Sequence, residues 1–479
     1  MDSSAKETTL LKDTSIKNSH NNPKSSQLGA FRERLFEPVD IASIAIFRMM
    51  FGAVIFWEVW RYFDYGWISS YYMVPNFYFK YYGFEWVHPW LGNGMYIHFV
   101  VIASCALCVM AGFLYRFTSW LLFFCLAYWF LLDQSRYLNH LYLIVLIAFL
   151  MAAIPAHRAN SLDTRRQPKL YSNTIPAWCL WLLRTQVGIV YFYGGLAKLN
   201  ADWLRGDPPR QWLAAHDHYP LIGSWISSET AVWIMSYGGL LFDLGVVPAL
   251  LWSKTRPWAF AACVGFHLMN ASLFSIGVFP FLMLAATLLL FPPDWPRKAC
   301  LLFTSIRDDS NQITPPVPIS KLRKRLIETS LAAYILIQAL LPLRHFLYPG
   351  SVHWTEEGQR FAWHMMVHHK RANVRFHVRD LSAGKDWEED HREYLSASQS
   401  RTIGDKPDLC LQFAHYLAAE MKKKGYQRIA IHAQANAELN NREFQRLIDI
   451  AVDLSNEPRN LWHADWIMPL EKRSKAPSK

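Results

Sequence analysis

Long apolar runs fill the first two-thirds of this 479-residue chain, whereas the last third is charged and has no such runs. Runs of roughly 16–24 apolar residues are typical of membrane-spanning helices. About nine spans are expected, at residues 41–63, 96–115, 117–132, 140–156, 176–199, 231–252, 258–270, 275–292 and 326–347. The pattern therefore predicts an α-helical polytopic membrane protein.

The polar part that follows the last span has the patterns of a mixed α/β domain. Residues 374–378 alternate apolar and polar side chains, as a half-buried strand does, and residues 428–433 read as a second strand. Residues 409–424 have the spacing of an amphipathic helix, and residues 358–371 are also expected to be helical. We therefore predict a disordered tail at 1–30, a membrane domain at 31–347 and an extracytoplasmic α/β domain at 348–479.

Lysine and arginine gather in alternate loops between the apolar spans. The segment before the last span carries Arg297, Lys298, Arg307, Lys321, Arg323, Lys324 and Arg325, whereas the opposite loops carry only Lys80, Arg136, Arg205 and Arg210. This asymmetry predicts a cytoplasmic N-terminus and a C-terminal domain in the periplasm, or in the lumen of a eukaryotic compartment. The net charge of +11 then follows from membrane topology and does not call for a nucleic acid partner.

Lys198 stands at the end of the apolar run 176–199, three residues after the pair Gly194-Gly195, which leaves room for close packing or a bound ring. An ammonium group next to hydrocarbon costs several kcal/mol, and desolvation favours the neutral amine, which is a base. Lys198 is therefore a candidate catalytic base. The alternative is a lysine that reaches from a helix end to the lipid headgroups. Asp202 follows four residues later and could pair with Lys198 if the helix continued, which would favour the charged amine.

Other polar residues interrupt the apolar spans. Asn139 and His140 begin one span, where Asn139 has the position of a helix cap. His267 and Asn270 lie one turn apart within another span, and their alternative role is hydrogen bonding between helices. Three charged residues lie inside separate spans: Arg48, Arg184 and Asp243. Each has either a functional role or a structural one, in which a salt bridge helps the helices to pack.

The run Trp363-His364-Met365-Met366-Val367-His368-His369 follows the last span. Tryptophan and methionine at helical spacing are typical of packing, but they also line pockets. Adjacent histidines such as His368 and His369 point in different directions on a helix, and the chain has no paired Cys-x-x-Cys units. No metal site is predicted.

Several of these segments, taken in order, resemble the vitamin K-dependent γ-glutamyl carboxylase family. They are Asn139-His140, residues 190–192 with 195–203, residues 266–270 and 273–277, residues 363–368, and residues 444–446 with Val452-Asp453. The resemblance covers most of residues 32–470. A single block would be a weak signal, whereas the ordered set is specific.

The resemblance implies a definite chemistry. A lysine deprotonates vitamin K hydroquinone, dioxygen adds to the anion, and the oxygenated product removes the γ-proton of a glutamyl side chain. The carbanion takes up carbon dioxide to give γ-carboxyglutamate, and the quinone leaves as its epoxide. Lys198 matches the family's base, and His140 matches the histidine that assists carboxylation. The further residues expected around the quinol and the substrate are Asn139, Arg184, His267, Asn270, Trp363, Met365, Met366 and His368.

The residues agree with this chemistry, because a glutamyl γ-proton is too weakly acidic for any side chain and an oxidation has to supply the driving force. The expected cofactor is reduced vitamin K, with dioxygen and carbon dioxide as co-substrates. The expected partners are a glutamate-containing protein or peptide, membrane lipid and a quinone reductase.

Two departures keep alternatives open. The chain is shorter than animal members of the family, and His364 stands where those members have an acidic residue. One alternative is therefore a quinol epoxidase or oxidoreductase without carboxylase activity. The other is a non-enzymatic quinone-binding or lipid-binding membrane protein.

Overall fold

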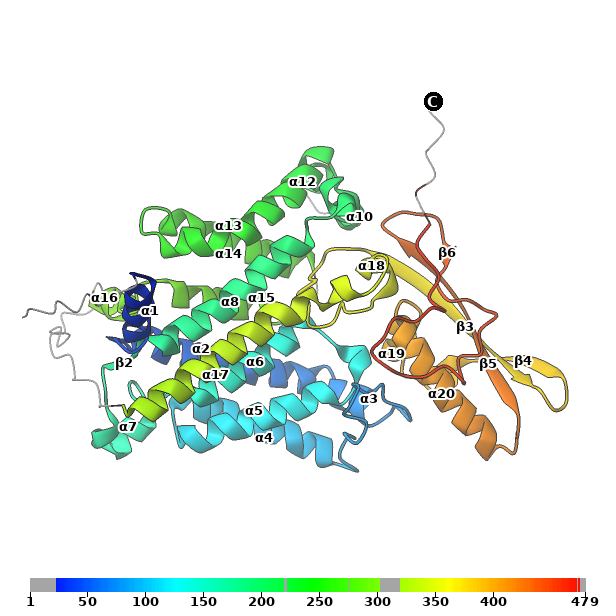
Figure 1. Ribbon diagram of the computed structural model, residues 1–479, viewed down its shortest axis with the longest axis horizontal. Helices are drawn as coiled ribbons and strands as arrows, with labels where there is room; N and C mark the ends of the chain where they lie inside the picture. The colour runs from blue at the N-terminus through cyan, green and yellow to red at the C-terminus, as the bar shows by residue number, and fades with distance from the viewer. Residues whose placement is uncertain (1–22, 219–221, 275, 302–318, 472, 474–479) are drawn as a thin grey trace, which may run out of the picture.

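The computed structural model describes residues 23–218, 222–274, 276–301, 319–471 and 473. A bundle of helices forms one end of the molecule, and a small sheet with helices packed against it forms the other end (Figure 1). The described part of the chain is mostly helical up to the end of the bundle, as the apolar runs predict. Residues 1–22 of the expected disordered tail lie outside the described residues, and residues 23–30 belong to helix α1 (Pro23–Arg34).

The bundle is built from helices of very different length. They are α2 (Ala42–Asp64), α3 (Trp67–Tyr72), α4 (Gly94–Ala111), α5 (Tyr115–Leu131), α6 (Asn139–Ala153), α7 (Leu162–Arg166), α8 (Ala177–Ala197), α9 (Ala201–Leu204), α10 (Asp207–Ala214), α11 (Gly223–Ile226), α12 (Glu229–Trp233), α13 (Gly239–Leu251), α14 (Arg256–Leu273), α15 (Phe279–Thr287), α16 (Trp295–Leu301) and α17 (Lys321–Leu340). A short antiparallel pair, β1 (Pro38–Asp40) with β2 (Thr174–Pro176), joins the starts of α2 and α8.

The expectation of about nine spans is not confirmed. Each expected span overlaps a helix, but four helices within the described ranges are long and apolar enough to cross a membrane: Ala42–Asp64, Gly94–Ala111, Glu229–Leu251 and Lys321–Leu347. Helix α6 ends after 15 residues and α5 after 17. At about 1.5 Å per residue, such helices are shorter than a hydrocarbon core of about 30 Å. The expected spans at these two places also contain apolar residues of the neighbouring turns, which are not part of the helices.

Helices α8 and α13 approach each other closely near the end of α8. A Cβ atom added to Gly195 would lie 2.6 Å from Leu244 Cδ2, whereas one added to Gly188 on the same helix would lie 3.8 Å from Val247 Cγ1. Small residues allow such close approach between helices. The pair Gly194-Gly195 thus has the packing role that its sequence position suggests.

The C-terminal part contains a four-stranded antiparallel sheet in the order β4-β3-β5-β6. Its strands are β3 (Lys370–Asp380), β4 (Lys385–Glu389), β5 (Ile429–Leu439) and β6 (Gln445–Arg446). Strands β3 and β5 pair over their whole length, from Lys370 with Leu439 to Asp380 with Ile429. Helix α20 (Pro407–Lys423) packs on β5 through its apolar face, and α19 (Ala397–Ile403) precedes it. The predicted strands at 374–378 and 428–433 and the helix at 409–424 are confirmed.

The prediction of a helix at residues 358–371 is wrong. After the short helix α18 (Val352–Thr355), the chain runs through turns until β3 begins. Phe361, Trp363 and Met366 have φ angles of 68°, 59° and 48°, values that a right-handed helix excludes. Trp363 is fully buried and stacks on Tyr142 with 5.0 Å between ring centroids. Its burial under the bundle fixes this irregular path, which a helical spacing of apolar residues does not reveal.

Polar contacts hold the bundle and the sheet together. Asp202, at the end of the bundle, accepts hydrogen bonds from Asn440 and Arg442 beyond β5. Gln399 Nε2 donates to Asp133 Oδ2 at 2.9 Å, on the other side of the junction. The segment that links α17 to β3 therefore lies between two connected parts, beside the ends of the bundle helices (Figure 1).

Candidate active site

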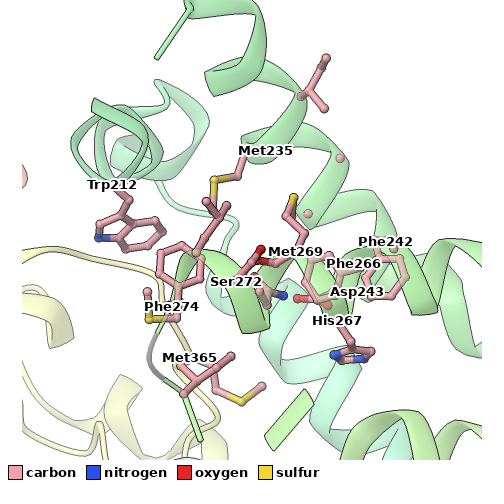
Figure 2. Close-up of a pocket in the computed structure, with 18 of the residues that line it drawn as sticks. Trp212, Met235, Phe242, Asp243, Phe266, His267, Met269, Ser272, Phe274 and Met365 are labelled. Carbon is pink, nitrogen blue, oxygen red and sulfur yellow. The ribbon is translucent and has the colours of Figure 1, made fainter. Parts of the chain in front are cut away.

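A cavity of about 810 Å³ opens in the bundle near its junction with the C-terminal part. Aromatic and aliphatic side chains make up most of its wall. Figure 2 shows Trp212, Phe274 and Met365 on one side of the space and Phe242, Phe266 and His267 on the opposite side. An apolar cavity of this size with a few polar groups is the usual form of a site for a small organic ligand.

Lys198 lines this cavity and forms an ion pair there. It follows the last residue of α8, and its Nζ lies 2.5 Å from Asp243 Oδ2 of α13. The two side chains are only 8% and 7% exposed. Nζ also donates to the carbonyl oxygen of Gly194 at 3.2 Å and lies 5.3 Å from the ring centroid of Trp203. Lys198 does not reach out to lipid headgroups, and its charge is compensated inside the protein.

Asp202 is not the partner of Lys198, so that expectation is wrong. Helix α8 ends at Ala197, and Asn200 starts the next helix by accepting a hydrogen bond from the Trp203 backbone N–H at 2.9 Å. The break turns Asp202 away to Arg442 and Asn440. Neighbours four residues apart meet only on a continuous helix.

A π-helical turn places Asp243. Residues Ile234–Gly238 form this turn between α12 and α13, and Met235 and Gly238 of the turn and Gly239, the first residue of α13, line the cavity. Such turns within α-helices are often found at functional sites. Asp243 then lies about one turn into α13, opposite the end of α8.

His267 and Asn270, both on α14, line the cavity as expected. His267 is 1% exposed, and its Nε2 is hydrogen-bonded to Tyr191 Oη of α8 at 2.8 Å. Its Nδ1 has no hydrogen-bond partner among the described residues. The alternative role of His267, a hydrogen bond between helices, is therefore present together with a place at the cavity.

The segment before β3 contributes Met365 and Met366 to the cavity wall. Trp363 does not line it, because its ring is turned into the core against Tyr142. Asn139 is the first residue of α6 and not a helix cap, and its Nδ2 donates to the carbonyl oxygen of His364 at 3.2 Å. Asn139 thus connects the bundle by a hydrogen bond to the irregular segment before β3.

His140 is not among the residues that line the cavity. Its ring lies against Phe279, with 6.0 Å between centroids, and Phe279 does line the cavity. His140 thus contacts a residue of the cavity wall without lining the cavity itself. Their expected position on one shared cavity is not confirmed.

Two arginines within the expected spans, Arg184 and Arg48, do not line the cavity, and Arg184 is the one expected there. Arg184 donates to the carbonyl oxygens of Leu289 and Phe291, both at 2.7 Å, so backbone oxygens and not a carboxylate satisfy it. Arg48 likewise donates to the backbone carbonyls of Ala156 and Asn160. The salt bridges considered for these two arginines are absent among the described residues, whereas Asp243 does have one.

His368 belongs to a second buried charge cluster, in the C-terminal part. Its Nε2 lies 3.4 Å from Glu356 Oε1, and the Nζ atoms of Lys370 and Lys406 lie 3.7 Å and 3.8 Å from the same carboxylate. Burial alone would raise the pKa of Glu356, but Lys406, Lys370 and His368 together lower it well below its usual range. We call these four residues the Glu356 cluster.

Histidines next to the Glu356 cluster are held neutral. The rings of His353 and His364 lie 5.2 Å apart, and burial, with neighbouring histidines, lowers the pKa of His364 to about 3. The same causes lower the pKa of His353 well below its usual range. Across the described ranges of the chain, no group of three or more His, Cys, Asp or Glu side chains is arranged to hold a metal ion.

The sequence missed several residues of the site. Trp212 and Met235 line the cavity, and their ordinary apolar positions gave no signal. Trp203 and Phe274 also line it, and they lie in the segments that resemble the family but were not expected as site residues. Asp243 carried a signal, a carboxylate within an apolar span, but nothing in the pattern connected it to Lys198.

Two family models match the chain. The HTTM domain matches residues 36–295, which is more than half of the chain, and the lumenal domain of vitamin K-dependent gamma-carboxylase matches residues 323–473. No solved structure matches it. Lys198, Asp243 and His267 fall within the first match, and Met365 and Met366 fall within the second. The cavity is thus built from both matched regions.

Proposed function

The chain belongs to the vitamin K-dependent gamma-carboxylase family, and from this membership we propose that it is an integral membrane γ-glutamyl carboxylase driven by oxidation of vitamin K hydroquinone. In this reaction quinol, dioxygen, carbon dioxide and a glutamyl side chain become vitamin K epoxide, water and γ-carboxyglutamate. The quinol supplies the oxidative driving force that no side chain can supply.

The observation that carries the proposal is an amine beside an apolar cavity. Lys198 Nζ and Asp243 are buried at the wall of a space of about 810 Å³. Phe242, Phe266 and Trp212 offer flat apolar surfaces for a fused aromatic ring. The residues present therefore fit a naphthoquinol better than a polar or charged ligand.

The side chains of the cavity have distinct proposed tasks. The aromatic and methionine residues hold the ring and exclude water, which strengthens electrostatic interactions within the site. Lys198 removes the quinol proton. His267 and Asn270 orient the quinol oxygens, and Met365 and Met366 form the wall toward the glutamyl substrate. His140, next to Phe279, assists carboxylation after movement of that ring.

The four apolar helices indicate membrane association, and we propose the orientation given by the charged loops. The N-terminus lies in the cytoplasm, and residues 348–479 lie on the opposite side, where they meet a glutamate-containing protein or peptide. A quinone reductase regenerates the quinol.

The test is an assay on membranes that contain the protein, with vitamin K hydroquinone, labelled bicarbonate and a glutamyl peptide. We expect label in the peptide and, in parallel, formation of epoxide. Absence of both products, with quinone binding retained, would reject an enzymatic function and favour a lipid-binding protein.

A second candidate is an epoxidase without carboxylase activity. It is favoured by His364, which stands in place of an acidic residue of animal members and belongs to a neutral histidine group beside Met365. Epoxide without label in any glutamyl peptide would select this alternative.

A further inference from the structure

We infer that Asp243 and Lys198 act together as one proton-accepting unit, a role that rests on the proposed function and extends it to Asp243. Nζ and Oδ2 are 2.5 Å apart, and both side chains line the cavity. They are the only charged side chains among the described residues that form its wall. The base of the site is therefore the pair and not a free amine.

The surroundings of Nζ favour the ammonium form at rest. The Asp243 carboxylate, the Gly194 carbonyl oxygen and the face of Trp203 all present negative charge or a negative potential to it. Of the other titratable groups that line the cavity, His267 and Tyr191 are hydrogen-bonded to each other. Asp202, which follows Lys198 in the chain but does not line the cavity, is paired with Arg442. A lysine that is protonated in this way cannot accept a second proton by itself.

The pair can accept a proton where a protonated lysine alone cannot. At rest, Asp243 and Lys198 share one titrating proton and carry no net charge. When the quinol O–H bond breaks, its electron pair stays on the quinol oxygen and the proton passes to the pair. Asp243 is then protonated, and the Lys198 ammonium lies beside the quinolate. The result is the same whichever of the two groups receives the proton first.

This coupling predicts a characteristic dependence on pH. The resting pair keeps one proton over a wide range, so the wild-type rate of epoxide formation is level around neutral pH. In Asp243→Asn, Lys198 titrates alone, and only its neutral form is a base. The variant therefore loses activity as the pH falls, because its amine becomes protonated.

The first experiment measures epoxide formation against pH in the full-length protein. For Asp243→Asn we expect a rate at about pH 6 that is at least ~10-fold below its own rate at about pH 9, whereas wild type changes less than about threefold. Asp243→Glu keeps a carboxylate and the level profile. The matched control is Glu58→Gln, which removes another buried carboxylate of the bundle, paired with Arg61 at 2.6 Å and away from the cavity wall.

The second experiment needs no quinol. The protein is treated with acetic anhydride, which acylates an amine only in its neutral form, and acylation of Lys198 is read by peptide mass spectrometry. Near neutral pH we expect Lys198 of Asp243→Asn to react about 10-fold faster than in wild type, since the carboxylate that stabilises the ammonium form is gone and more of the amine is neutral. Glu58→Gln should match wild type.

The outcomes separate the two levels of the proposal. Parallel pH profiles and equal acylation in wild type and Asp243→Asn would overturn the proton-accepting pair while leaving the carboxylase proposal intact. No epoxide from wild type at any pH would reject the proposed function, and with it the role of the pair as a base. If Asp243→Asn does not fold, loss of activity at low pH in Asp243→Glu would also overturn the pair.

Discussion

Two buried carboxylate–lysine groups in this protein have the same chemistry and opposite surroundings. Asp243 meets Lys198 at the wall of a cavity. Glu356 meets Lys370 and Lys406 inside packed protein, where Lys370 Nζ also donates to the carbonyl oxygens of Trp354 and Asp405, both at 2.6 Å. The first group lines the cavity of about 810 Å³, and no residue of the second group does. The comparison shows that a buried ion pair is a candidate catalytic group when it borders a cavity that can hold a ligand. Without such a cavity, the same kind of pair is better explained as a group that stabilises the fold.

The largest effect is expected from a substitution that removes the ion pair at the cavity. Lys198→Met should lower the rate of epoxide formation about 1000-fold, because removal of a catalytic base costs two to four orders of magnitude. Turnover of purified protein measures this effect. Lys80→Met is the control, since Lys80 donates to the carbonyl oxygen of Val87 and does not line the cavity. An active Lys198→Met would exclude Lys198 as the base.

The next largest effect is expected from a substitution in the Glu356 cluster. Glu356→Gln leaves two buried lysine ammonium groups without their counter-charge and should lower the free energy of unfolding by about 3 kcal/mol. Denaturant titration at constant protein concentration measures this change. Glu388→Gln, whose side chain is 51% exposed, should change stability by less than about 0.5 kcal/mol. Equal stability of the two variants would contradict the structural role of the Glu356 cluster.

A smaller effect concerns the approach of α8 to α13. Gly195→Ala would place Cβ 2.6 Å from Leu244 Cδ2 and 3.2 Å from Asp243 Cβ, so the Leu244 side chain or the backbone of one helix has to shift. We expect a loss of about 2 kcal/mol in stability together with slower epoxide formation. Gly188→Ala on the same helix meets its first neighbour only at 3.8 Å and should leave both quantities unchanged. A full rate in Gly195→Ala would show that the spacing of the pair is not critical.

The smallest effect is a pH dependence of stability beside the Glu356 cluster. His364 has a pKa of about 3 in the folded protein and a higher one when unfolded, so its contribution is present above about pH 6.5 and is lost as the pH falls toward 3. Between about pH 7 and pH 6, wild type should lose roughly 0.7 kcal/mol that His364→Asn retains. Thermal unfolding over this range measures the slope, with His377→Asn on β3 as the control. Identical slopes for His364→Asn and wild type would contradict the neutral state of His364.

The sequence located the helices well because each long apolar run must be buried in protein or lipid. Local pattern also singled out Lys198, which lines the cavity, and the close packing at Gly194-Gly195. The number of spans is not confirmed, and the ends of the expected spans were misplaced where a turn such as the one at Pro155 is as apolar as the helix before it. Apolar content alone does not mark where a short helix stops.

Partners in the fold were harder to predict. Asp243 lies 45 residues from Lys198, and Arg442 lies 240 residues from Asp202, so neither pairing leaves a trace in the spacing. The break of α8 before Asp202 comes from the cap at Asn200, and the path of residues 358–371 comes from the burial of Trp363. In both places tertiary contacts, and not the helical periodicity of the sequence, determine the path of the backbone.

The π-helical turn at Ile234–Gly238 has a consequence for how this site could be lost. Such a turn holds one residue more than an α-helical turn, and each residue rotates a helix by about 100°. Deletion of a single residue there would let α12 and α13 merge into one regular helix, and the same step would swing Asp243 away from Lys198. A variant of this chain that lacks one residue of the turn would thus keep its fold and lose the proposed catalytic pair.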